Sequence, residues 1–229
     1  MTPFELIPWI LGQCASVKEA RERLEELNLL DEAFAEKMPL SPLHWMIADK
    51  EECIIMECIQ DGIHIYENPY GVLTNNPPFP YYQMHLNNYL NLSSENPQNG
   101  FAPEIPLNTY GQGMGAIGLP GDYSPASRFV KAAYLKWNSR SSEEENANVS
   151  QFFHILDGVS MVRGSVITPE GREDITTYSC CINADQGIFY YKTYDNNQIQ
   201  AVRMQKENLD SKELKIFDLE LEQQILWRN

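Results

Sequence analysis

The spacing of hydrophobic and polar positions changes several times along this chain, and each change marks a predicted helix or strand. Residues 16–29 repeat apolar side chains every three or four positions, which predicts an amphipathic helix. Its apolar face consists of Val17, Ala20, Leu24 and Leu27. Residues 2–13 are predicted to begin an earlier helix, because Thr2 is followed by Pro3 and, three positions later, by Glu5.

After residue 29 the spacing of apolar positions becomes shorter. Short β-rich runs separated by polar turns there predict a strand meander. These runs are residues 43–48, 52–58 and 62–66, with a further strand leading into Asn75. Residues 81–92 are predicted to form a helix. Residues 93–117 are rich in Pro, Gly and Asn and predict a long loop, a feature that is usually functional or used in subunit contact.

A second alternation of helices and strands fills the rest of the chain. Ser124 and Pro125 have the residue types of a helix start, so a helix is predicted over 124–137. The elements predicted after it are a polar spacer over 139–147, a helix over 149–156, and strands over 176–182, 187–193 and 198–202 with hairpin turns at 183–186 and 195–197. This order predicts an α+β protein that forms a single domain over residues 1–229.

Charge and composition exclude several classes of function. The net charge of −15 repels nucleic-acid backbones and anionic membrane surfaces, so neither is expected as a partner. No apolar run approaches the roughly 20 residues of a membrane span, and a cytoplasmic location is expected. The five cysteines form no CxxC pair and are predicted to be free thiols.

The sequence offers few motifs for a cofactor or a metal. The glycines of residues 113–118 match a dinucleotide-binding string, but the strand and helix that such a site needs do not flank them. The four histidines lack metal-ligand spacing, and His44 and His64 lie on predicted strands, where hydrogen-bonded structural roles are expected. No metal or organic cofactor is therefore predicted.

Two polar residues in glycine- and proline-rich segments are the candidate catalytic groups. Asn75 lies in Gly71-Val-Leu-Thr-Asn-Asn-Pro77, and Arg128 follows Gly118-Leu-Pro-Gly-Asp122 at the start of a predicted helix. Asn75 has two interpretations, a turn residue before proline or an amide donor to an oxyanion. Arg128 could equally be a solvated helix residue.

These two segments, together with Ser127-Arg-Phe-Val130 and Ser150-Gln-Phe-Phe-His-Ile-Leu156, resemble the choloylglycine hydrolase family. That family includes bile salt hydrolases and penicillin V acylases. The resemblance implies an N-terminal nucleophile hydrolase with an αββα fold, in which an N-terminal cysteine attacks an amide and forms a thioester. It implies that Asn75 helps to hold the oxyanion. It also implies that Arg128 lies beside the nucleophile, where a cation favours the thiolate.

The resemblance also implies what this chain lacks and what it binds. The chain opens Met1-Thr-Pro-Phe-Glu5, and we expect it to start after roughly the first third of a family member, the part that carries the nucleophile. Thr2 is not expected to replace the nucleophilic cysteine, because its sequence context predicts a helix N-cap. We therefore expect no turnover by this chain alone, although conjugated bile salts are the substrates that the resemblance implies.

Further expectations concern binding and assembly. Phe34 and Met38 are candidates to line a steroid pocket, or else belong to the core. A homotetramer is expected, with residues 88–117 in subunit contacts. Two alternatives stay open at this point, a non-catalytic remnant that binds bile acids and an amidase that prefers penicillin V.

Overall fold

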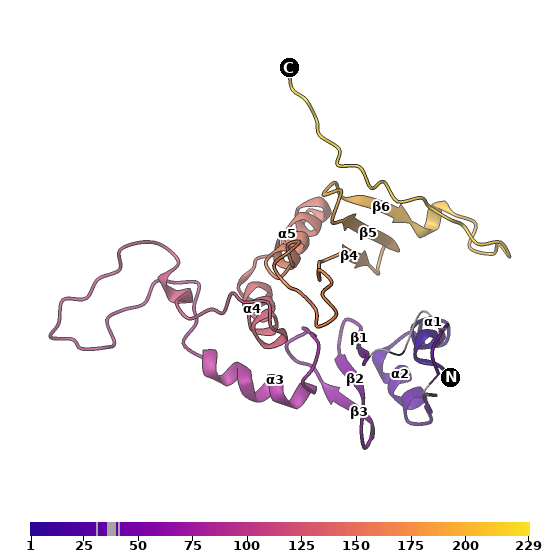
Figure 1. The fold of residues 1–229 in the computed structure, drawn as a ribbon, viewed down its shortest axis with the longest axis horizontal. Coiled ribbons are helices and arrows are strands. Elements are labelled where there is room, and N and C mark those ends of the chain that lie inside the picture. Colours follow the sequence, from indigo (N-terminus) through magenta and orange to yellow (C-terminus); the bar gives the residue numbers. More distant parts are fainter. Residues whose placement is uncertain (31, 36–39, 41) are drawn as a thin grey trace. The chain divides into compact units, whose positions relative to one another are not determined.

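The computed structural model describes all residues of the chain except 31, 36–39 and 41. The chain forms two compact units, residues 1–133 and residues 134–229 (Figure 1). Both units combine helices with an antiparallel sheet, so the predicted α+β composition is confirmed. Among the described residues, no helix has the length and apolar character needed to cross a membrane.

The first unit begins with three short helical elements, η1 (Pro3–Glu5), α1 (Leu6–Leu11) and α2 (Val17–Leu24). The Glu5 carboxylate accepts hydrogen bonds from the backbone N–H of Thr2 at 2.8 Å and from its hydroxyl at 3.0 Å. The Ser16 hydroxyl accepts a bond from the N–H of Glu19 at 3.2 Å. Both helix starts are therefore placed as the capping pattern predicts.

A three-stranded antiparallel meander forms the centre of this unit. It consists of β1 (His44–Ala48), β2 (Cys53–Ile59) and β3 (Gly62–Glu67), with β2 in the middle. On one face, Ile54 and Met56 pack against the apolar sides of α1 and α2. On the other face, Ile55 packs in a cluster with Phe79, Phe129 and other apolar residues. Because β2 is buried on both faces, its sequence is a nearly continuous apolar run.

The predicted strand into Asn75 is not present. Residues 68–78 form an irregular loop between β3 and α3 (Phe79–His85). The buried Asn68 side chain closes a turn at the end of β3: its Oδ1 accepts from the N–H of Gly71 at 3.0 Å and its Nδ2 donates to the Val72 carbonyl at 3.2 Å. Gly71 has a φ of 59°, a conformation that glycine adopts without strain. Asn75 thus lies in a loop and not at a strand end.

A long loop, drawn in magenta in Figure 1, follows α3 and η2 (Leu86–Tyr89). It contains η3 (Met114–Ala116) and confirms the loop predicted over residues 93–117. A Cβ on Gly115 would collide with the carbonyl oxygens of Glu95 and Ser93, so this glycine permits close backbone packing. The glycine string of residues 113–118 is accordingly part of a packed loop.

Helix α4 (Pro125–Asn138) follows the loop, and α5 (Glu145–Asp157) belongs to the second unit. Helix α5 begins four residues earlier than Val149, the predicted start. The side chain of Asn148, in the first turn, bonds both the N–H and the C=O of Ser142, at 2.6 and 2.7 Å. The polar spacer is therefore tied to the helix start.

The second unit holds a second antiparallel meander. Its strands are β4 (Tyr178–Asn183), β5 (Ile188–Thr193) and β6 (Gln200–Arg203), followed by η4 (Met204–Lys206). The Glu145 carboxylate of α5 accepts bonds from Asn183 at 2.6 Å and from the Tyr190 hydroxyl at 2.9 Å. Both hairpin turns lie where the sequence predicts them. The segment after η4 is exposed and has no regular secondary structure.

Candidate functional site

A buried tyrosine of α3 holds the loop that carries Asn75. The Tyr82 hydroxyl donates to the backbone carbonyls of Asn75 at 2.6 Å and of Asn76 at 3.0 Å. Burial raises the pKa of the Tyr82 phenol, so the group stays protonated as a donor. The Thr74 hydroxyl donates to the carbonyl of Pro125 at 3.1 Å, which joins the loop to the start of α4.

Arg128 lies in the first turns of α4 and reaches the Asn75 side chain. Its Nε donates to the carbonyl of Tyr123 at 3.0 Å, and its Nη2 donates to Asn75 Oδ1 at 2.6 Å. A guanidinium can only donate, so the contacted atom of Asn75 must be the oxygen. The Asn75 NH₂ group therefore points away from the guanidinium and makes no hydrogen bond to any described residue. The structure brings the two predicted residues together, and their catalytic roles stay predictions.

Asp122 organises the turn that precedes α4. Its carboxylate accepts from the Ser124 N–H at 2.9 Å and from the Ser127 hydroxyl at 2.5 Å. Hydrogen bonds from Ser124 and Ser127 lower the pKa of the Asp122 carboxyl from 3.8 to about 2. These contacts fix the helix start and hence the position of Arg128, one residue beyond Ser127.

This lowered pKa predicts a pH dependence of stability. Because the folded pKa lies below the ordinary value, the Asp122 carboxylate stabilises the fold above about pH 4 and this stabilisation is lost as the pH falls toward 2. Asp122→Asn should therefore lower the free energy of unfolding at neutral pH and flatten its fall in that acid range. Urea unfolding at several pH values measures the effect, with Asp218→Asn in the exposed tail as control. Parallel pH curves for Asp122→Asn and the unsubstituted chain would contradict the assignment.

A buried acid that was not predicted from the sequence lies next to the start of α3. Glu57 of β2 is 1% exposed, and its Oε2 accepts from the backbone N–H of Phe79 at 2.9 Å. Its Oε1 lies 2.7 Å from His44 Nδ1 on β1. The available signal was a glutamate inside the apolar run Cys53-Ile-Ile-Met-Glu-Cys58. A charged residue in such a run is rarely buried without partners.

The predicted steroid-pocket residues are placed only in part. The Phe34 ring is exposed and contacts the Phe4 ring edge to face, with centroids 5.5 Å apart. Met38 lies outside the described residues. His64, predicted to be a structural histidine, bonds Asp61 at 2.9 Å on the β2–β3 hairpin. Within the described part of the chain, no three His, Cys, Asp or Glu side chains converge as metal ligands would.

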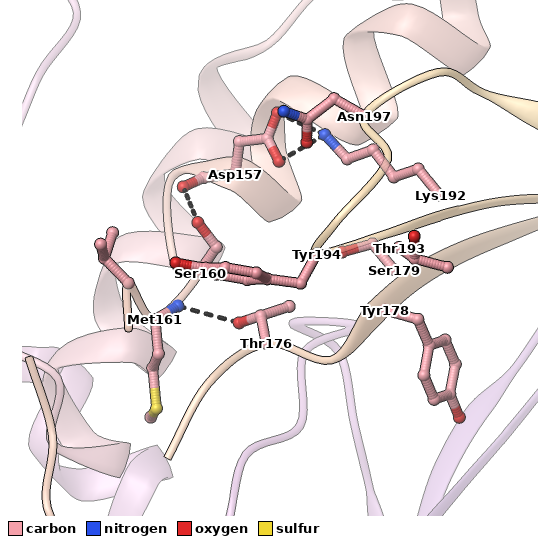
Figure 2. Close-up of a pocket in the computed structure, with 11 residues that line it drawn as sticks. Asp157, Ser160, Met161, Thr176, Tyr178, Ser179, Lys192, Thr193, Tyr194 and Asn197 are labelled. Atoms are coloured by element: carbon pink, nitrogen blue, oxygen red, sulfur yellow. Dashed lines mark hydrogen bonds and ion pairs between the residues drawn. The ribbon is translucent and has the colours of Figure 1, made fainter. Parts of the chain in front are cut away.

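A separate polar hollow of about 320 Å³ lies in the second unit (Figure 2). Figure 2 shows the Lys192 ammonium against the Asp157 carboxylate, with contacts of 2.7 and 2.8 Å. The Ser160 hydroxyl donates to the Asp157 carbonyl, and Thr176 Oγ1 accepts from the Met161 N–H at 2.8 Å. These polar groups therefore bond to one another.

Comparisons with known proteins connect this geometry to a family. The family model described as linear amide C–N hydrolases, choloylglycine hydrolase family, matches residues 1–217. The bile salt hydrolase/transferase of Lactiplantibacillus plantarum is 50% identical over 98% of this chain and 69% of its own length. That of Clostridium perfringens is 39% identical over 93% of this chain and 65% of its own length. This chain thus spans about two thirds of the length of these relatives.

Solved structures agree with the family match. A crystal structure of a cysteine-to-alanine variant of the conjugated bile acid hydrolase from Clostridium perfringens superposes with a TM-score of 0.90. It is 38% identical and matches 100% of this chain and 70% of that one. Penicillin V acylase from Agrobacterium tumefaciens shares the fold, with a TM-score of 0.68 at 18% identity over 90% of this chain and 57% of that one. The predicted α+β fold of an N-terminal nucleophile hydrolase is confirmed, and the chain belongs to the choloylglycine hydrolase family of linear amide C–N hydrolases.

Proposed function

We propose that this chain supplies the oxyanion-binding part of an enzyme that hydrolyses the amide bond of glycine- or taurine-conjugated bile salts. The observation that carries the proposal is the 2.6 Å bond from Arg128 to Asn75 Oδ1. That bond orients the Asn75 amide so that its NH₂ group is presented to a ligand. The substrate class is proposed because two relatives that cover most of this chain are named bile salt hydrolase/transferase.

In the proposed reaction a cysteine thiolate attacks the amide carbonyl carbon and the carbonyl oxygen becomes an oxyanion. The Asn75 NH₂ group donates to that oxyanion and stabilises the tetrahedral intermediate. The C–N bond then breaks, the amine takes a proton and leaves as glycine or taurine, and water hydrolyses the thioester. Arg128 orients Asn75 and adds positive charge that favours the thiolate.

The cysteines of this chain do not fit the role of the nucleophile. Burial raises the pKa of the Cys180 and Cys181 thiols, which disfavours the thiolate form that attacks. Cys14, Cys53 and Cys58 contribute no atom to the hydrogen bonds described around Asn75. The attacking thiolate in the proposal is the N-terminal cysteine that the family resemblance implies.

A chimera tests the proposal. In this hydrolase chimera, residues 1–229 replace the matching segment of the Lactiplantibacillus plantarum bile salt hydrolase/transferase. We expect the hydrolase chimera to release glycine from glycocholate, and the 229-residue chain alone to release none. A well-folded hydrolase chimera without activity toward glycocholate or taurocholate would contradict the proposal. Turnover by the 229-residue chain would contradict the assignment of the nucleophile.

The same two proteins test the alternatives. Faster release of phenoxyacetate from penicillin V than of glycine from glycocholate would favour a penicillin acylase. Glycocholate binding without turnover in the hydrolase chimera would favour a binding protein. The proposal further includes a cytoplasmic homotetramer, supported by the family resemblance, and light scattering of the hydrolase chimera measures its assembly.

A further inference from the structure

We propose that Glu57 and His44 form a buried clamp that positions the Asn75 loop for catalysis, an inference that rests on the proposed function. The two residues lie directly opposite each other on β1 and β2. Their side chains are only 1% and 8% exposed, and His44 Nδ1 lies 2.7 Å from Glu57 Oε1. Neither residue is expected to touch the substrate, so both act through the loop.

The clamp holds both ends of the segment that follows Asn75. His44 Nε2 lies 3.1 Å from Asn76 Oδ1, on the residue next to Asn75. Glu57 Oε2 accepts from the N–H of Phe79, the first residue of α3, at 2.9 Å. One histidine and one carboxylate thereby connect the central sheet to Asn76 in the loop and to Phe79 at the start of α3.

The burial of Glu57 and His44 distinguishes this pair from a surface ion pair. An exposed ion pair contributes little to stability, whereas a buried carboxylate requires hydrogen bonds to each oxygen. Both oxygens of Glu57 have such partners, and both partners lead to the Asn75 loop. Tyr82 holds the backbone carbonyls of Asn75 and Asn76, so Tyr82 and the clamp together fix the backbone from which the Asn75 side chain projects.

The first test uses hydrogen exchange of the 229-residue chain and is independent of activity. Glu57→Ala should speed exchange of the Phe79 amide by about tenfold or more, because its charge-assisted bond is lost. His44→Ala should speed exchange of the same amide by a smaller factor, because it removes only the partner of Glu57 Oε1. Exchange within β4 and β5 should not change in either variant. Unchanged exchange at Phe79, or a uniform increase throughout residues 1–133, would overturn the clamp.

The second test measures catalysis in the hydrolase chimera. His44→Ala and Glu57→Ala should lower kcat by about 10–100-fold with little change in KM, because loop position is lost and substrate contacts are kept. Glu57→Gln keeps an acceptor for the Phe79 N–H and should restore most of the rate. The control is His64→Ala, which removes a comparable but exposed histidine–aspartate pair on the hairpin and should leave kcat unchanged.

The two tests separate failure of the clamp from failure of the proposed function. If the unsubstituted hydrolase chimera is inactive, the proposed function fails and the exchange results alone decide whether the clamp exists. If the hydrolase chimera is active and kcat is unchanged in both alanine variants, the positioning role is overturned. An equal fall in kcat in His64→Ala and in the two alanine variants would overturn the positioning role as well.

Discussion

Asn75→Ala in the hydrolase chimera is expected to lower kcat for glycocholate hydrolysis by about 10²–10³-fold, the usual cost of removing one oxyanion donor. The Asn75 side chain is exposed, and its single hydrogen bond to a described residue is accepted from Arg128 at 2.6 Å. Its loss should therefore affect the transition state far more than the fold. The KM should change little, because the oxyanion develops only during reaction.

The measurement is the rate of glycine release at saturating glycocholate. The matched control is Asn88→Ala, which removes another exposed asparagine, in η2, and should leave kcat unchanged. A loss confined to KM would indicate a contact with the bound substrate and not with the oxyanion. An unchanged kcat would remove Asn75 from the mechanism.

Phe129→Ala is expected to lower the free energy of unfolding by about 3–5 kcal/mol, the range for deleting a fully buried phenylalanine ring. Phe129 of α4 is 0% exposed. Its ring stacks on Tyr82 at 4.6 Å between centroids and meets the edge of Phe79 at 6.2 Å. Truncation leaves a cavity directly between α4, which carries Arg128, and α3, which supports the Asn75 loop.

Urea unfolding of the 229-residue chain measures this effect. Phe101→Ala is the control, because that ring is 85% exposed in the long loop, and its removal should change the unfolding free energy by less than about 0.5 kcal/mol. A loss near 5 kcal/mol would be a large part of the stability of a typical domain. Similar unfolding free energies for the two variants would show that the aromatic cluster does not hold α3 to α4.

The regular elements of this fold could be predicted because each has a local signal. Ser16 with Glu19 marks the start of α2, and the apolar positions of residues 17–24 mark its buried face. Short β-rich runs separated by polar turns mark both meanders. Such signals depend on neighbouring residues alone, so they can be recognised without knowledge of the fold.

The loop around Asn75 could not be predicted because long-range contacts determine it. Apolar residues 72–73 suggest a strand, but Asn68 closes a turn there and Tyr82, later in the sequence, fixes the carbonyls that follow. The pairing of His44 with Glu57 likewise depends on strand register. Local sequence context left Asn75 and Arg128 with two interpretations each, and family resemblance favoured the catalytic one. Nothing in the sequence indicated the hydrogen bond between them.

The most direct test of the account is a double-mutant cycle on kcat in the hydrolase chimera with Asn75→Ala, Arg128→Lys and both together. A lysine has one compact donor group and cannot bond both the Tyr123 carbonyl and Asn75 Oδ1 in the geometry of the guanidinium. If Arg128 acts through Asn75, the loss in the double variant should be well below the product of the two single losses. Losses that simply multiply would show that the two residues act independently and would contradict the account.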